Sequence, residues 1–301
     1  MTSPSPPLPR ASLRDLCLWL ALAGAWSSSY VVIKLGVATL DPMLLVAGRM
    51  VVGMLALTGI FFALGHSLSR HPADWLSYGI TGLLGSVVPF LLITYGETVV
   101  DSALAAILMG VSPVATALLA AMALPDERLS GRVVVGLGGA LFGVILLAGP
   151  DALSGLGAQF AGQGAILGAT LCYALSTVYI RRWVRRPPME MAAGSALVGT
   201  GMLLLAVLLS GVRPGGGDLT PVALGAVLYL GLVSTAAANL VYFYLVPRLG
   251  ATRMSQVNFA VPVGGALLGV GLLGERLAPL QWGALMVIIG SVWLTTSRRR
   301  A

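Results

Sequence analysis

Residues 89–113 read PFLLITYGETVVDSALAAILMGVSP, and residues 238–262, at a constant offset of 149, read ANLVYFYLVPRLGATRMSQVNFAVP. Both stretches are mainly apolar, and each ends in a proline, Pro113 or Pro262. A pattern that recurs at a fixed distance along a chain indicates two similar structural units.

The shared pattern extends beyond these two stretches. Each proline is followed by the triplet Glu-Arg-Leu, at residues 127–129 and at residues 275–277, and then by two glycines that are seven residues apart. Earlier in each half, residues 26–34 lie opposite residues 173–181 at an offset of 147. Several landmarks in the same order, separated by small shifts, are typical of an internal duplication.

The composition indicates an integral membrane protein. Hydrophobic residues make up 57% of the 301 residues and charged residues only 10%, whereas a soluble domain carries about 25% charged residues. The net charge of +7 comes from basic residues that lie between long apolar runs rather than on one face. Nucleic acid is therefore not an expected partner, and membrane lipid is.

The predicted fold is an all-α membrane protein of ten transmembrane helices, because ten mainly apolar windows reach the roughly 20 residues that a spanning helix needs. The sequence Ala23-Gly24-Ala25 resembles a signal-peptidase site, but the apolar run continues past it to Ile33, which favours a retained helix. Residues 1–12 are expected to be a disordered tail, residues 13–149 a first five-helix repeat and residues 150–301 a second. The windows are 14–36, 43–64, 74–96, 100–123, 131–149, 163–182, 190–210, 221–245, 252–273 and 280–297.

The basic residues give an expected orientation, since lysine and arginine are enriched in cytoplasmic loops. With the N-terminus in the cytoplasm, fourteen of the eighteen basic residues fall on the inner side. The four on the outer side are Lys34, Arg49, Arg213 and Arg276. An odd number of helices would scramble this bias, so it favours ten helices with both termini in the cytoplasm. Five helices per half also place the second half upside down relative to the first, as in transporters that bind substrate between inverted repeats.

These landmarks resemble a known family. The spaced residues Trp26, Lys34, Pro42 and Arg49, together with the proline and Glu-Arg-Leu block of both halves, look like the EamA-type repeat of the drug/metabolite transporter superfamily. The chain looks most like its bacterial aromatic amino-acid exporter branch. The resemblance implies a ten-helix bundle, a central cavity lined by helices 1, 3, 4, 6, 8 and 9, and export of amino acids.

Polar residues and prolines inside the apolar windows are candidate parts of a substrate site, because polar groups are costly in a bilayer. Other roles remain open: serines can bond to their own helix, prolines can bend a helix, amides can join helices, and tyrosines near helix ends can belong to the aromatic belt. The three serines 27–29 cannot all face one direction, because neighbours on a helix are about 100° apart. The residues predicted to line the cavity are Trp26, Ser28, Tyr30, Tyr95, Ser112, Pro113, Tyr173, Ser176, Asn239, Asn258 and Pro262.

Arg49 is a buried cation by its position, seven residues past Pro42, or about 10 Å along a helix. It needs an anionic or carbonyl partner there. Asp41 or Glu97 is the expected structural partner, and a substrate carboxylate is the functional alternative.

The sequence favours transport of a zwitterionic or neutral metabolite such as an amino acid. Drug or nucleotide-sugar transport is the alternative within the same class, but phosphates call for several intramembrane cations. A membrane channel is the alternative from another class, although no filter-like sequence occurs. No enzyme motif, metal site or cofactor is expected. Every acidic residue falls at a helix end or in a loop, so facilitated transport without proton coupling is predicted, provided that Glu97 and Asp101 stay outside the cavity.

Overall fold

The computed structural model describes residues 12–123, 131–148, 158–213, 215, 219–255 and 257–296. Every regular element in these ranges is a helix, and η1 and η2 are π-helices. The elements are α1 (Leu13–Val37), α2 (Pro42–Ala63), α3 (Pro72–Gly82), η1 (Leu83–Val87), α4 (Val88–Gly96), α5 (Ser102–Met109), α6 (Ser112–Ala123), α7 (Gly131–Ala148), α9 (Ala158–Trp183), α10 (Pro188–Ser210), α11 (Pro221–Tyr229), η2 (Leu230–Ala237), α12 (Ala238–Ser255), α13 (Val257–Leu273) and α14 (Pro279–Thr296).

Seven helical segments in the described ranges are long and apolar enough to cross a membrane. The first six lie at Leu13–Val37, Pro42–Ala63, Pro72–Gly96, Ser102–Ala123, Gln159–Trp183 and Pro188–Ser210, and the seventh at Pro221–Tyr242. Three further apolar segments are shorter, at Val134–Gly143, Ala260–Leu273 and Pro279–Ser291. The chain is therefore an all-helical membrane protein.

The helix starts follow from local sequence signals. Ser12 caps α1 through its hydroxyl, and Asp15 returns a bond to the Ser12 main chain, which satisfies two donors of the first turn. Five helices begin with a proline, which has no N–H and therefore loses no hydrogen bond in the first turn. Pro42, Pro72, Pro188, Pro221 and Pro279 therefore mark the starts of these five helices.

The fourth expected window is not one continuous helix. It is interrupted between Met109, where α5 ends, and Ser112, where α6 begins. The expectation that Pro113 lies in mid-helix is therefore wrong, because Pro113 falls in the first turn of α6, where its missing N–H costs nothing. Its repeat-related counterpart Pro262 does lie inside a helix, α13, as expected.

The eighth expected window ends ten residues too early, since α12 continues to Ser255. The extension is held against the first turns of α1. Leu245 and Leu249 are buried there in one cluster with Leu22 and Ala23. Tertiary packing thus continues a helix that local sequence signals would have ended.

A π-helix interrupts two long helical rods at matching places. In the first rod η1 separates α3 from α4, and in the second rod η2 separates α11 from α12. Gly82 directly precedes η1, and Gly231 is the second residue of η2, so the two glycines are separated by the same offset of 149 that relates the sequence halves.

Both glycines lie where another helix comes very close. A Cβ built on Gly82 would lie 2.6 Å from the main-chain oxygen of Ser195 on α10. A Cβ built on Gly231 would lie 2.6 Å from the Cβ of Val52 and 3.0 Å from the main-chain oxygen of Arg49, both on α2. Side chains of any size would separate these helices, so glycine permits the contact.

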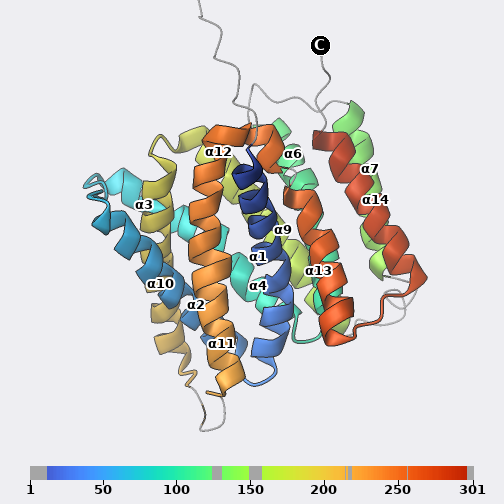
Figure 1. Cartoon of the computed structure of the whole chain (residues 1–301), viewed down its shortest axis with the longest axis horizontal. Coiled ribbons are helices and arrows are strands. Elements are labelled where there is room, and N and C mark those ends of the chain that lie inside the picture. The colour runs from blue at the N-terminus through green and yellow to red at the C-terminus, as the bar shows by residue number, and fades with distance from the viewer. Residues whose placement is uncertain are drawn as a thin grey trace, which may run out of the picture.

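The helices form one bundle (Figure 1). Helices α7 and α14 pack side by side at one edge, while α10 packs on α2 and α3 at the opposite edge. Between them α13 packs on both α1 and α5, and α9 packs on α4 and α6. The core surrounds α5, whose residues Ser102–Leu108 are all buried. Helix α1 begins and α14 ends at the same end of the bundle (Figure 1).

Candidate functional site

Arg49 is the buried cation in the interior of the bundle, where it is only 6% exposed. Helix α2 carries it, and Asp41 starts that helix by accepting a 2.8 Å hydrogen bond from the Met43 N–H. The Arg49 Nε donates to the Thr235 hydroxyl in η2 at 3.1 Å. Its guanidinium carbon lies 3.8 Å from the centre of the Phe90 ring on α4, a cation–π contact.

Among the described residues, no carboxylate forms an ion pair with Arg49. Asp41 serves as the α2 cap, and the side-chain oxygens of Glu97 accept no hydrogen bond. The expectation that one of these two acids neutralises Arg49 is therefore wrong. A guanidinium has five N–H donors, and Thr235 takes only one. The planar fork thus retains donors for an anion that approaches from the interior.

Two of the predicted tyrosines belong to the core of the bundle. Tyr30 on α1 is 7% exposed and belongs to the main core cluster, against which Tyr173 on α9 also packs. Of the residues predicted from the sequence, Tyr30 and Tyr173 are thus brought into one core cluster, from helices far apart in the chain.

The serines of α1 point in different directions, as their spacing predicted. Ser27 donates to the Val261 carbonyl on α13 at 3.2 Å, and Ser29 donates back to its own helix. Ser28 lies 2.8 Å from the Tyr229 hydroxyl on α11, and also bonds to the Gly24 carbonyl one turn earlier. Ser28 is therefore the member of the trio that reaches a side chain of another helix.

The other predicted residues are spread around the bundle. The Trp26 ring on α1 packs 6.0 Å from the Tyr242 ring on α12. Ser176 on α9 faces Gly85 in η1, at 3.0 Å from the place of a Cβ there. Asn239 donates to the carbonyl of Thr235 on its own helical rod at 2.6 Å.

Four more predicted residues form no described hydrogen bond or ring contact with Arg49, and one of them has a side chain outside the described part of the chain. Ser112 begins α6, and its carbonyl accepts from Thr116 at 2.9 Å. The Pro262 ring lies 3.3 Å from the place of a Cβ on Gly110, so α13 packs on the break between α5 and α6. Tyr95 is 46% exposed at the end of α4. The side chain of Asn258 lies outside the described part of the chain.

Sequence reasoning missed three contributors, Phe90, Thr235 and Tyr229. None stands out in an apolar helix, since each is an ordinary residue type for such a segment. The depth of Arg49 along α2 was the available signal, because a cation that far from a helix end needs partners in neighbouring helices.

Polar contacts close the bundle at the end where α1 finishes, called here the Lys34 end. The Lys34 ammonium donates to the main-chain oxygens of Glu97 and Val100, each at 2.8 Å. The Glu275 carboxylate, after α13, accepts from the Ser102 N–H, the Ser102 hydroxyl and the Ala103 N–H at 2.8–2.9 Å. Glu275 thus caps the positive end of α5, and α1, α4, α5 and α13 are tied together.

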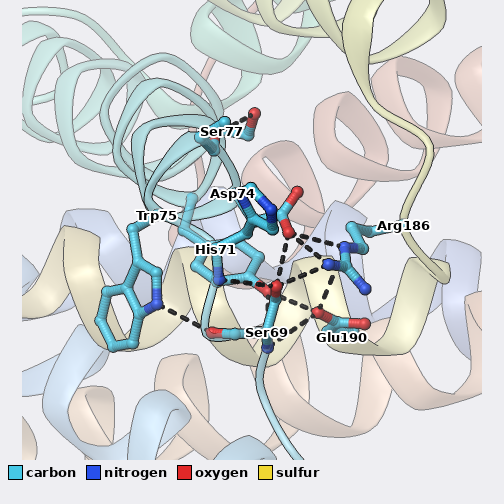
Figure 2. A network of polar contacts seen from close by, with 9 residues as sticks. Ser69, His71, Asp74, Trp75, Ser77, Arg186 and Glu190 are labelled. Carbon is cyan, nitrogen blue, oxygen red and sulfur yellow. Dashed lines mark hydrogen bonds and ion pairs between the residues drawn. The ribbon is translucent and has the colours of Figure 1, made fainter.

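A second network closes the opposite end, called here the Arg186 end (Figure 2). Arg186, between α9 and α10, forms an ion pair with Asp74 on α3 and lies 3.9 Å from Glu190 on α10. The Ser69 hydroxyl donates to Asp74 at 2.5 Å and accepts from Arg186. The buried Tyr78 hydroxyl donates to Glu190 at 2.5 Å. Because Asp74 holds it by hydrogen bonds and charge, the pKa of Arg186 is raised further, and the guanidinium stays ionised.

The same end is closed between α1 and α12. Arg248 on α12 forms a 3.0 Å ion pair with Asp15, which is 3% exposed in the first turn of α1. The guanidinium of Arg248 lies 5.0 Å and that of Arg14 lies 5.5 Å from the centre of the Tyr244 ring.

In the described residues no group of three or more His, Cys, Asp or Glu side chains could hold a metal ion.

The EamA-like transporter family matches the chain twice, over residues 14–149 and 160–297. A solved structure whose title reads only "Crystal structure of protein" covers 95% of this chain and 99% of its own, with a TM-score of 0.65 and 23% identity. This likeness concerns the fold alone.

Three relatives that are similar over most of their length have names that describe transporters or an efflux pump. The uncharacterized inner membrane transporter YedA of Escherichia coli (strain K12) is 30% identical over 280 residues, which cover 92% of this chain and 88% of YedA. The uncharacterized transporter YoaV of Bacillus subtilis (strain 168) is 26% identical, with 91% and 95% covered. A probable amino-acid metabolite efflux pump of Escherichia coli (strain K12) is 27% identical, with 93% and 94% covered. The chain therefore belongs to the EamA-like transporter family and carries two copies of its domain.

Proposed function

We propose that this protein transports amino acids or similar small zwitterions across the inner membrane, in the direction of export. The observation that carries the proposal is Arg49, a buried guanidinium without an acidic partner in the described part of the chain. A buried charge is costly unless it is paired. A substrate carboxylate would supply that pair each time the site is filled.

The chemistry of Arg49 suits a carboxylate. The guanidinium fork can bind a carboxylate with two parallel hydrogen bonds, and Thr235 occupies only the Nε donor. A phosphate ester would need more than one cation in the interior. Trp26 and Ser28, which lie on the same helix as Tyr30, would contact the remainder of the substrate.

The proposed architecture is ten helices in two inverted repeats, with both termini in the cytoplasm. The two π-interrupted rods support it. The rod Pro72–Gly96 begins at the Arg186 end, where Asp74 meets Arg186. The rod of α11, η2 and α12 finishes at that same end, where Arg248 meets Asp15. The two rods therefore run in opposite directions, as inversion requires.

The closing networks at the two ends fit alternating access. Transport requires the Lys34 end and the Arg186 end to open in turn while the other stays closed. Contacts between helices of different halves, such as Asp74 with Arg186 and Ser102 with Glu275, would break and reform during the cycle. The division at residues 149 and 150 separates the two moving units.

Counterflow in proteoliposomes tests the proposal. Vesicles loaded with unlabelled amino acids should take up the same labelled amino acid, and the corresponding amine without its carboxyl group should not exchange. The Arg49→Gln variant should raise KM by about 10-fold to 150-fold, because it loses a charge-assisted pair of about 1.5–3 kcal/mol. Arg49→Lys should fall between the two, since lysine keeps the charge but loses the fork.

Arg213→Gln is the matched control, since Arg213 is exposed between α10 and α11. It should leave KM unchanged. Amino-acid exchange with an unaltered KM in Arg49→Gln would remove Arg49 from the site. A wild-type protein that exchanges no amino acid from a full panel, or that conducts without counterflow as a channel does, would reject the proposed function.

A further inference from the structure

Glu97 is a fully buried acid in the turn between α4 and α5, with 0% of its surface exposed. Both of its side-chain oxygens are buried without a hydrogen-bond partner, and no other buried side-chain atom in the described residues shares this state. Burial of an ionised carboxylate without a partner is costly, and the group then shifts toward its neutral form. The proposed substrate site leaves this acid unexplained.

The charged groups around Glu97 are held by other partners. Lys34 on α1 donates hydrogen bonds to two main-chain oxygens, those of Glu97 and Val100. Glu275, before α14, caps α5 and adds negative charge from the opposite side. Arg49 on α2 acts on Glu97 only by long-range electrostatic attraction, without a hydrogen bond. Tyr30 on α1 is also close enough to interact electrostatically with Glu97.

We propose that Glu97 is a proton-binding site and that its protonation is required to close the Lys34 end of the bundle. In the closed state the carboxyl is the neutral acid, which the dry interior tolerates. When the Lys34 end opens, water reaches the group, the O–H bond breaks, the electron pair stays on the carboxylate and the proton passes to water. Reclosure takes a proton back from the same side.

The electrostatics agree with this geometry. Burial raises the pKa of the Glu97 carboxyl well above its usual value, and Glu275 acts in the same sense, while Lys34 and Arg49 oppose the rise. The closed form therefore holds a proton that the open form releases. Each pH unit above the titration would then shift the balance toward the open state by up to about tenfold. This site adds a proton requirement to the proposed transport cycle, but proton binding itself does not depend on which substrate is carried.

Thiol labelling reports the opening directly. In a protein with Cys17 and Cys172 replaced by serine, Val100→Cys places a thiol on a residue that is 2% exposed in the closed end. Thr98→Cys, on an exposed residue of the same turn, corrects for the ordinary pH dependence of thiol reactivity. The corrected labelling rate of Val100→Cys by an impermeant reagent should rise by about tenfold or more from about pH 6 to about pH 8.

Glu97→Gln should abolish that rise and keep the end closed, because the amide imitates the protonated acid. Asp101→Asn, at an exposed acid four residues later, should retain the wild-type rise. An equal pH dependence in wild type and Glu97→Gln overturns the proposal, and so does a wild-type rate that stays flat.

A measurement without substrate or new cysteines covers the case in which Glu97→Gln does not fold. The folded state binds the extra proton, so the Tm of the wild-type protein should be highest at low pH within this range and fall as pH rises through the Glu97 titration. Asp101→Asn should preserve the fall. A wild-type Tm that is constant or rises over about pH 5 to about pH 9 overturns the proton site, whereas failed amino-acid exchange with an intact fall rejects only the proposed function.

Discussion

Gly82→Ala is the substitution whose effect on stability follows most directly from the packing of the helices. The added Cβ would lie 2.6 Å from the main-chain oxygen of Ser195 and 3.1 Å from both the Cα and the N of Gly199. All three atoms belong to the α10 main chain, so no side-chain rotation can relieve the clash. Gly79 is the natural control, because a Cβ there would meet only a Val198 methyl group at an ordinary 3.8 Å.

The two substitutions separate packing from helix propensity. Alanine favours a helix over glycine by about 1 kcal/mol at either site. Overpacking a close contact costs about 1–3 kcal/mol, and this cost applies at Gly82 alone. We therefore expect Gly79→Ala to be neutral or stabilising, and Gly82→Ala to be less stable than Gly79→Ala by about 1–3 kcal/mol. At about 2–4 °C per kcal/mol for a chain of this size class, the two Tm values should differ by several degrees.

Thermal unfolding of the purified proteins in one detergent measures this difference. Gly231→Ala should resemble Gly82→Ala, because its Cβ would lie 2.6 Å from the Val52 Cβ and 3.0 Å from the Arg49 main-chain oxygen. Equal Tm values for Gly79→Ala and Gly82→Ala would refute the close approach of α3 to α10 that underlies the expected effect.

Four other substitutions probe the closing networks and the orientation. Tyr78→Phe removes the buried donor to Glu190 and should lower the free energy of unfolding by about 1.5–3 kcal/mol, and an unchanged Tm would contradict that bond. Asp15→Asn breaks the ion pair with α12, so the Tm of the variant should vary less with salt than that of the wild type; the same salt dependence in both would speak against the pair. In a cysteine-free background, Thr98→Cys should react with an impermeant reagent from outside intact cells and Arg185→Cys should not, and the reverse pattern would invert the proposed orientation.

Much of the fold was predictable because it rests on local signals. Long apolar windows predicted most boundaries to within a few residues, and the window 43–64 matches α2, which Asp41 caps. The misplaced boundaries depend on contacts between distant segments. The extension of α12 rests on packing against Leu22 of α1, and neither π-helix has a sequence signal that distinguishes it from an α-helix.

The candidate site was predictable only in part. The depth of Arg49 followed from counting residues along α2, whereas its partners Thr235 and Phe90 come from other helices and required the fold. The burial of Glu97 could not be predicted from its place in the sequence. A loop position normally means exposure, but this turn is folded into the core, so an acid assigned to a loop is among the most buried residues.

The π-helix η1 also marks a position where the chain can lose or gain one residue. A π-helix accommodates one extra residue in a helix while the segments on either side keep their original facing. Deletion of a single residue between Leu83 and Val87 would restore α-helical pairing and leave α3 and α4 in place. The same deletion elsewhere in the rod would turn every later side chain by about 100°. Within this rod, η1 is thus the place where one residue could be gained or lost without turning the later side chains away from their contacts.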